Sequence, residues 1–309
     1  MHVIDSVEAA RAWRSSIDQR VRVGLVPTMG ALHRGHGRCI ESCSQDSDVT
    51  VVSIFVNRSQ FGDPQDYATY PRTWDDDVEI AREAGASVVF APHDDEMSAL
   101  MKANPRHSGK LASLWEGRHR PGHFDAVVTV VNQLFSPIRP NRARFGEKDR
   151  QQLAVIRDWA TVEWPSIFID AEPTVREPDG LAMSSRNVRL TPTARKNACT
   201  LYQVLTLMKQ GVERGEYSTR SLIDECLPHL SSSFELDYLD VVDPVSFHAL
   251  PRVRDGAVAI AAATIDGVRL IDKPELGLSN WQNGRTLARG GILSGDDIRT
   301  YRFRMQQAD

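Results

Sequence analysis

A strand–turn–helix pattern near the N-terminus limits the folds open to this chain more than any other feature. Residues 21–26 are mostly apolar and predict a buried strand, Pro27 and Gly30 predict a turn, and a helix is expected to begin near residues 33–36. A second apolar, β-branched run at 49–56 predicts a strand that is covered on both faces. A strand, a helix and a strand in this order indicate a parallel sheet.

The alternation of strands and helices continues to about residue 170. The predicted elements are helices at 73–85, 125–135 and 150–159 and strands at 87–91, 142–145 and 166–170. Pro137 is expected to end the second of these helices, because proline lacks an N–H group. The polar run 93–117 has no clear period and is expected to be irregular. The alternation predicts an α/β fold, a doubly wound Rossmann-like parallel sheet that binds ligands at the carboxyl ends of its strands.

The sequence pattern changes after residue 187. Apolar residues at helical spacing predict helices around 201–212 and 222–227. Three further segments predict a small antiparallel sheet, with Asp266 and Gly267 as a hairpin turn. The segments are 236–242, 257–263 and 268–271.

We therefore expect two domains. Residues 1–187 would form the Rossmann-like, nucleotide-binding domain, and residues 188–309 a second, smaller α+β C-terminal domain. The tail after Asp272 contains several glycines and arginines and little core signal, so we expect it to be partly mobile or to make a contact.

The composition excludes several function classes. Hydrophobic residues make up 41% and charged residues 25%, as in ordinary globular proteins, and a net charge of −4 gives no support for nucleic acid as a partner. The first thirty residues do not resemble a secretory signal, and no apolar window is long enough to span a bilayer. We expect a cytoplasmic protein with no membrane partner. The four cysteines, none in a Cys-x-x-Cys pair, fit a reducing compartment.

His33 and His36 would lie where the first predicted helix begins. Unpaired N–H groups and the positive end of the helix dipole make such a position a site for phosphate, and imidazoles would add donors. The small residues Gly30, Ala31 and Gly35 would let a ligand approach the backbone. This stretch predicts a nucleotide site.

Two alternatives for the histidines remain open. They could be surface or capping residues. They could also join Cys39 and Cys43, which fall near the same helical face, in a metal site. The metal alternative is disfavoured, because both cysteines are expected to pack inward, and no metal-binding residues are assigned.

Further polar clusters follow predicted strands. Lys148 could neutralise a phosphoryl oxygen at the same sheet edge, and Gln152, one turn later, could orient a polar substrate. The Ser184-Ser185-Arg186 loop would suit a polyphosphate, because Ser donates without bulk and Arg binds bidentately. Charge-rich loops of this kind can also be ordinary solvated surface.

Past the second strand, Asn57, Gln60 and Phe61 place a polar pair beside an aromatic ring, which suits a small hydroxylated acid. Arg120 and His123, in an Arg-Pro-Gly-His-Phe run, form another polar cluster.

Six motifs, in the same order and with similar spacing, resemble the pantothenate synthetase family of the His-x-Gly-His nucleotidyltransferase superfamily. They lie at residues 26–36, 55–61, 70–72, 120–124, 145–152 and 180–187. Residues 238–244 and 270–272 also resemble the C-terminal domain of that family.

The resemblance implies an AMP-forming ligase of the coenzyme A pathway with two half-reactions. Pantoate would attack ATP to give pantoyl adenylate and pyrophosphate, and β-alanine would then attack the adenylate to give pantothenate and AMP. It also implies that Mg²⁺ arrives with ATP and that the enzyme is a homodimer.

The resemblance further implies roles for individual residues. The catalytic set is His33, His36, Lys148, Ser184, Ser185 and Arg186. The set that binds pantoate and β-alanine is Asn57, Gln60, Phe61, Tyr70, Arg120, His123 and Gln152. The set that lines the ATP pocket is Pro27, Thr28, Met29, Gly30, Gly146, Asp149 and Val175.

The sequence departs from the family pattern at a few places. Arg34, Gly37 and Arg58 stand where the family usually has an acidic residue, an apolar residue and proline, and segment 97–114 lacks an expected Tyr-Pro-x-Gly stretch. One alternative is therefore a paralogous adenylate-forming amide ligase with a different acid or amine. A non-catalytic ATP-binding module is disfavoured, because binding alone would not need His33, His36, Lys148 and Arg186 together.

Overall fold

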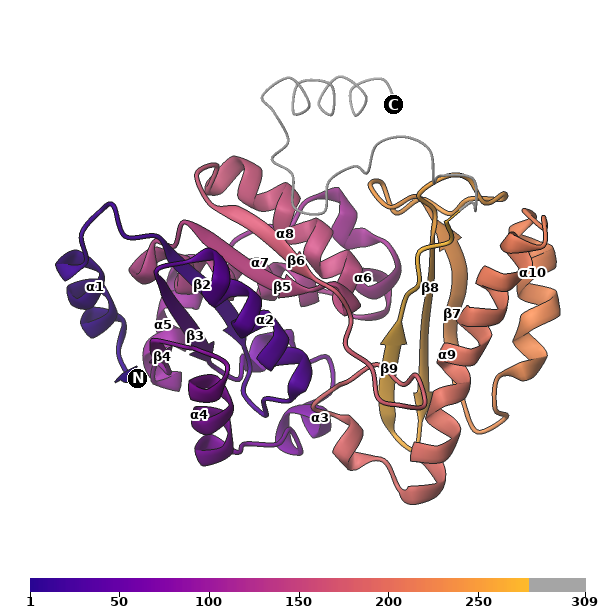
Figure 1. The fold of residues 1–309 in the computed structure, drawn as a ribbon, viewed down its shortest axis with the longest axis horizontal. Helices are drawn as coiled ribbons and strands as arrows, with labels where there is room; N and C mark the ends of the chain where they lie inside the picture. The colour runs from indigo at the N-terminus through magenta and orange to yellow at the C-terminus, as the bar shows by residue number, and fades with distance from the viewer. Residues whose placement is uncertain (278–309) are drawn as a thin grey trace. The chain divides into compact units, whose positions relative to one another are not determined.

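The computed structural model describes residues 1–277, and within them it contains a six-stranded parallel sheet and a three-stranded antiparallel sheet (Figure 1). The parallel sheet has the strand order β1-β4-β3-β2-β5-β6. Its strands are β1 (His2–Ile4), β2 (Val23–Thr28), β3 (Val49–Ile54), β4 (Val88–Phe90), β5 (Arg142–Gly146) and β6 (Phe168–Glu172). The order reverses at β2, which lies between β3 and β5, and such a switch point opens a crevice for ligands.

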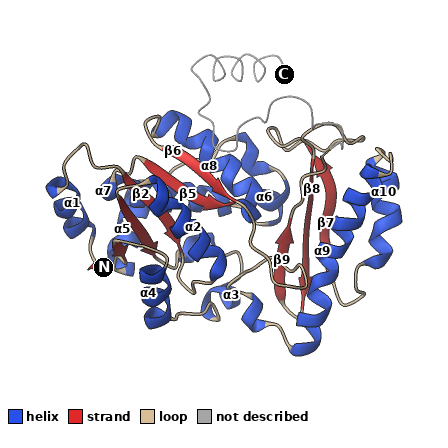
Figure 2. Ribbon diagram, in the orientation of Figure 1, coloured by secondary structure: helices blue, strands red, loops and turns tan. Residues whose placement is uncertain are grey.

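Helices cover both faces of the parallel sheet (Figure 2). They are α1 (Val7–Ser16), α2 (Arg34–Asp46), α3 (Pro64–Ala68), α4 (Trp74–Glu83), α5 (Asp94–Ala103), α6 (Trp115–His119), α7 (His123–Ile138) and α8 (Arg150–Glu163). Leu25 and Val51 pack into one core with α1, α5, α7 and α8, while Val26 and Val52 pack into another with α2 and α4. Successive residues of a strand face opposite ways, so the sheet is buried on both sides, which confirms the doubly wound fold.

The expectation of an irregular segment at 93–117 is wrong. The segment contains α5, a short 3-10 helix (Lys110–Ser113) and α6. Met97 and Met101, four residues apart, lie on the buried face of α5, and its first turn is acidic, as the dipole of a helix favours. The Met residues, which adapt to irregular gaps, obscured the helical period.

Two smaller expectations about prolines also fail. Pro137 does not end α7 but lies inside its last turn, and the helix closes at Arg139, whose N–H donates to the Phe135 carbonyl at 2.7 Å. Pro27 lies within β2 rather than in the turn. Both prolines lie near the carboxyl end of their element, Pro137 in the last turn of α7 and Pro27 beyond the residues of β2 that pair with β5.

The second sheet is formed by β7 (Glu235–Val242), β8 (Val258–Ile265) and β9 (Val268–Asp272), and helices α9 (Pro192–Glu213) and α10 (Thr219–Cys226) pack against it. Asp266 (φ 53°) and Gly267 (φ 70°) form the predicted hairpin turn between β8 and β9. This confirms a smaller α+β region after the parallel sheet. The domain boundary at residues 187 and 188 stays a prediction.

The expectation for the tail falls mostly on residues 278–309, which lie outside the described residues. Among the helices of residues 1–277, none is both long enough and apolar enough to cross a membrane.

Candidate active site

A cavity of about 230 Å³ lies at the carboxyl ends of β2 and β5, beside the switch point of the parallel sheet. It gathers most of the residues that the sequence singled out. The predicted residues that line it are Pro27, Thr28, Met29, His33, His36, Gln60, Tyr70, Arg120, His123, Gly146, Lys148, Asp149, Gln152, Val175, Ser184, Ser185 and Arg186. Gly30, Asn57 and Phe61 lie behind this lining.

The turn after β2 is held by a buried carboxylate. Asp77, in the first turn of α4, accepts hydrogen bonds from the backbone N–H groups of Ala31 and Leu32 at 3.0 and 2.7 Å. Gly30 has φ 75°, and a Cβ there would lie 2.9 Å from the carboxylate. The expectation that small residues admit a ligand is therefore replaced at Gly30, where glycine makes room for Asp77.

The two histidines cap α2 and each other. The Nδ1 atom of His33 accepts from the Gly35 N–H at 3.1 Å, and Nδ1 of His36 accepts from the His33 N–H at 3.3 Å. The rings stack with centroids 4.0 Å apart. A Cβ on Gly35 would lie 2.9 Å from Cε1 of His33, so glycine is needed there for the ring itself.

Burial keeps both imidazoles uncharged, and the capping hydrogen bonds decide which ring nitrogen carries the proton. Burial, reinforced by the charge of Lys148, lowers the pKa of His33 to about 4 and holds the pKa of His36 well below its usual value. Both rings are therefore neutral near pH 7. Because each Nδ1 atom accepts a hydrogen bond, each proton resides on Nε2, which leaves an N–H donor free for a ligand.

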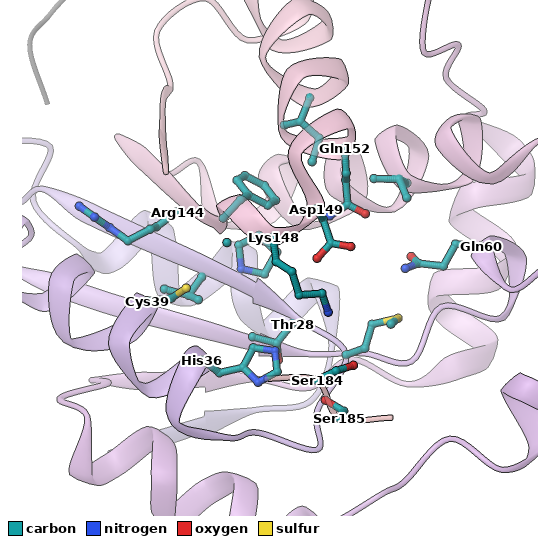
Figure 3. A pocket seen from close by; sticks show the side chains of 18 of the residues that line it. Thr28, His36, Cys39, Gln60, Arg144, Lys148, Asp149, Gln152, Ser184 and Ser185 are labelled. Carbon is teal, nitrogen blue, oxygen red and sulfur yellow. The ribbon is translucent and has the colours of Figure 1, made fainter. Parts of the chain in front are cut away.

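Lys148 approaches the same cavity from the end of β5, the strand next to β2. A short 3-10 turn, Glu147–Asp149, joins the end of β5 to α8 and presents both Lys148 and Asp149. Figure 3 shows Lys148 pointing into the cavity that also contains His36, Ser184 and Ser185. A cation, neutral N–H donors and hydroxyl groups thus surround one space, an arrangement that stabilises negative charge on phosphoryl oxygens.

Gln60 is held in place by its neighbours. Its Oε1 atom accepts from Nδ2 of the buried Asn57 at 3.0 Å. Its backbone carbonyl accepts from Arg120 at 2.9 Å and contacts Nδ1 of His123 at 2.8 Å. Burial and the charge of Arg120 lower the pKa of His123 to about 3, so this ring is neutral and donates to the carbonyl. Asn57 supports Gln60 instead of lining the cavity.

The Ser-Ser-Arg loop is tied to two other elements. Ser185 donates to the Ala31 carbonyl at 2.9 Å, which joins this loop to the turn after β2. Arg186 donates through Nε and Nη2 to the carboxylate of Asp66 in α3, at 3.0 and 2.8 Å. Its guanidinium also lies over the ring of Phe61, 5.5 Å from the centroid. Phe61 thus supports Arg186 from outside the lining.

Sequence reasoning missed several residues of the site. Asp66 and Asp77 occur in polar stretches where nothing local marks them, since their partners lie 120 and 46 residues away along the chain. Arg144, which pairs with Glu172 at 3.1 Å, lines the cavity but lies in a predicted strand. Val127, Val131 and other apolar residues of α7 belong to the core and also form the apolar wall of the cavity.

The structure shows where the cysteines of the metal alternative and the departures from the family pattern lie. Cys39 and Cys43 lie on the buried face of α2, and Cys39 also lines the cavity. Burial raises the pKa of the Cys39 thiol to about 12, and residues 1–277 contain no group of three or more His, Cys, Asp or Glu side chains placed to hold a metal ion. Arg34, Gly37 and Arg58 do not line the cavity, and neither does any residue of segment 97–114.

Comparisons with known proteins agree with this geometry. The sequence pattern of the family described as Pantoate-beta-alanine ligase matches residues 2–275. The pantothenate synthetase of Thermotoga petrophila is 37% identical over 284 residues, covering 90% of this chain and 100% of that protein. The enzyme of Thermus thermophilus is 42% identical over 260 residues, covering 83% and 94%.

Solved structures give the same result. The crystal structure of pantothenate synthetase from Thermus thermophilus superimposes with a TM-score of 0.85 and 40% identity, covering 90% of this chain and 100% of that one. The pantoate-β-alanine ligase of Francisella tularensis, solved with a β,γ-ATP ligand and β-alanine, gives a TM-score of 0.75 and 31% identity, covering 89% and 98%. The chain therefore belongs to the pantoate-β-alanine ligase family, and its activity is that of a ligase that produces pantothenate.

Proposed function

We propose that this ligase works through pantoyl adenylate, with ATP as the activating substrate. In the first step a pantoate carboxylate oxygen bonds to the α-phosphorus of ATP, and the bond from phosphorus to the pyrophosphate oxygen breaks. In the second step the amine of β-alanine bonds to the acyl carbon, the bond to the AMP oxygen breaks, and the nitrogen loses a proton. The observation that carries this proposal is the convergence of His33, His36, Lys148, Ser184 and Arg186 on one cavity.

The residues have complementary proposed roles in the first step. Negative charge spreads over the phosphoryl oxygens as the bonds to phosphorus change, so preorganised donors and cations lower the barrier. Lys148 supplies the positive charge, while the Nε2–H groups of His33 and His36 supply donors without a charge of their own. Ser184 and Arg186 would hold the pyrophosphate that leaves.

We assign the two substrates to different groups of residues in the cavity lining. Gln60, fixed by Asn57, and Gln152 would bind the hydroxyl and carboxylate groups of pantoate, with Tyr70, Arg120 and His123 beside them. Met29, Gly146, Asp149 and Val175 would line the ATP side. We propose that Mg²⁺ enters as part of the MgATP substrate.

The test is product analysis with the purified protein. With ATP, pantoate and β-alanine together, pantothenate, AMP and pyrophosphate should form in equal amounts. With pantoate but no β-alanine, labelled pyrophosphate should exchange into ATP, because the adenylate forms reversibly. Failure of that exchange, with pantothenate still produced, would contradict the adenylate route.

Pantoate is favoured over another small acid because the departures from the family pattern lie outside the cavity lining. Pyrophosphate exchange with a panel of hydroxy acids tests this choice. Stronger exchange with another acid than with pantoate would favour the paralogous ligase instead.

We also propose that the enzyme is a cytoplasmic homodimer, on family likeness. Light scattering of the purified protein would measure the mass of the assembly, and a mass equal to one chain would contradict the dimer. Fractionation of the native cells would test the location.

A further inference from the structure

Strand β9 and the residue that follows it contact three segments that carry residues of the cavity. Within residues 1–277, Arg269, Asp272 and Lys273 each form an ion pair with a residue far earlier in the chain. None of these three side chains lines the main cavity. Each partner, however, is close in sequence to a residue that does.

Arg269 forms an ion pair with Glu116 in α6. Its two terminal nitrogens donate to the two carboxylate oxygens, each at 2.7 Å, and the Tyr238 hydroxyl donates to the same carboxylate at 2.6 Å. Glu116 is buried and also lies 3.7 Å from Arg120, which in turn donates to the backbone carbonyl of Gln60. This chain of contacts connects β9 to the proposed pantoate side.

Asp272 forms an ion pair with Arg176, which lies in the segment between β6 and α9. Two nitrogens of the guanidinium donate to the carboxylate at 2.6 and 2.8 Å, and one of them also donates to the Gly180 carbonyl at 3.0 Å. The guanidinium lies over the Tyr202 ring, 4.1 Å from its centroid. Arg176 pairs by backbone with Ala182, so this contact fixes the base of the Ser-Ser-Arg loop.

Lys273 forms an ion pair with Glu147, the residue before Lys148. Its Nζ atom donates to the carboxylate at 2.9 Å, and the lysine side chain is only 7% exposed. Burial opposes ionisation of Glu147, but Lys273 lowers its pKa below the usual value. The contact holds the short turn from which Lys148 enters the cavity.

The position of the strand end supports a role at the site. A smaller cavity is lined by Arg120, Lys148 and Gln152 from the main cavity and by Asp272 and Lys273. Asp272, at the carboxyl end of β9, and Lys273, just beyond it, therefore line the same small cavity as Lys148 and Gln152.

Stability alone is a weak reason for such an arrangement. Removing ionic groups from water costs several kcal/mol per ion, roughly, and apolar residues of similar size are often at least as stabilising. Buried ion pairs do, however, fix geometry, because only one arrangement satisfies both charges. Catalysis depends on such geometry, and about 1 Å of displacement can cost on the order of a hundredfold in rate.

We propose that Arg269, Asp272 and Lys273 form a positioning clamp, through which the C-terminal sheet positions three segments of the active site: helix α6, the base of the Ser-Ser-Arg loop and the turn that carries Lys148. Each residue of the clamp positions a different part of the cavity lining, which we call a wall. Arg269 acts on Arg120 and Gln60, Asp272 acts on the Ser-Ser-Arg loop, and Lys273 acts on Lys148. The assignment of walls rests on the proposed function, whereas the contacts themselves do not.

The test compares single variants in steady-state kinetics of AMP formation by the full chain. Arg269→Met should raise the KM for pantoate, Asp272→Asn should raise the KM for ATP, and Lys273→Met should lower kcat, each by about tenfold with the other constants within about threefold. Lys273→Arg, which keeps the charge, should restore most of the lost kcat. Arg214→Met, which removes an exposed ion pair with Glu225, is the matched control and should keep wild-type kinetics.

The outcomes separate the clamp from the proposed function. Loss of the same constant in all three variants, in proportion to the lowering of Tm, would show a merely structural role and overturn the clamp, as would wild-type kinetics in all three. If Lys273→Met does not fold, Glu147→Gln breaks the same pair from the other side and should show the same fall in kcat. A wild-type protein that forms no AMP would refute the proposed function itself.

Discussion

The two walls of the cavity that approach the phosphate site are built in opposite ways. The histidine wall is local, because His33, Gly35 and His36 satisfy one another within four residues of chain. The lysine wall is held from a distance, because the turn that carries Lys148 is fixed by Lys273, 126 residues away from Glu147. The first wall is neutral and the second is charged.

The difference separates two ways to preorganise a site. A helix cap needs only its own residues, and the turn before it needs Asp77, so the histidine wall should form whenever β2, α2 and α4 form. A long-range ion pair requires the second sheet to be folded and in place. Lys148 is thus coupled to the C-terminal region, and the N–H donors of His33 and His36 are not.

The largest effect should come from removing the charge. Lys148→Ala should lower the rate of adenylation by about a hundredfold or more, because one charge-stabilising group is lost from the transition state. Rapid-quench measurement of pyrophosphate release would determine the rate. Lys102→Ala, at an exposed position of α5, is the control. An unchanged rate in Lys148→Ala would remove the lysine wall from the comparison.

An intermediate effect should come from breaking the local cap. Gly35→Ala places a Cβ about 2.9 Å from the His33 ring, so the ring must move, and we expect a fall of about tenfold in the adenylation rate. Gly37→Ala is the matched control, because no atom lies within 4 Å of its added Cβ. It should keep activity and gain about 1 kcal/mol of stability from better helix propensity. Equal activity in the two variants would contradict the role of the cap.

The smallest effect should be on the pH dependence of stability. The pKa of His33 is about 4 in the folded protein and near 6.5 in an unfolded chain, so between these values the unfolded state binds more protons. The free energy of unfolding should therefore fall as the pH drops from 6.5 towards 4.

His33→Asn should make this fall shallower, because one group that is neutral in the folded state no longer titrates on unfolding. Urea unfolding at several pH values between 4.5 and 7 would measure the slope. His229→Asn, at an exposed position, should keep the wild-type slope. A slope unchanged in His33→Asn would mean that the His33 ring is not held neutral.

Prediction from the sequence succeeded where signals were local or periodic. The alternation of strands and helices led to the doubly wound sheet, and the helix expected to begin near residues 33–36 begins at Arg34. The helix α5 in segment 93–117 was missed because two Met residues and short polar turns left little period. Asn57 and Phe61 were expected in the substrate pocket, but they lie behind Gln60 and Arg186, a distinction of depth that a linear pattern does not contain.

The sequence by itself determined the order of the elements, the caps of the helices and the set of polar residues that follow the strands, because these depend on neighbours within a few positions. Only the tertiary structure decided which charges meet. Arg269 and Glu116 are 153 residues apart, and Arg186 and Asp66 are 120 apart, so no local rule pairs them. Their pairing follows from how the β9 end and α3 pack beside the cavity, where a buried charge must find a partner of opposite sign.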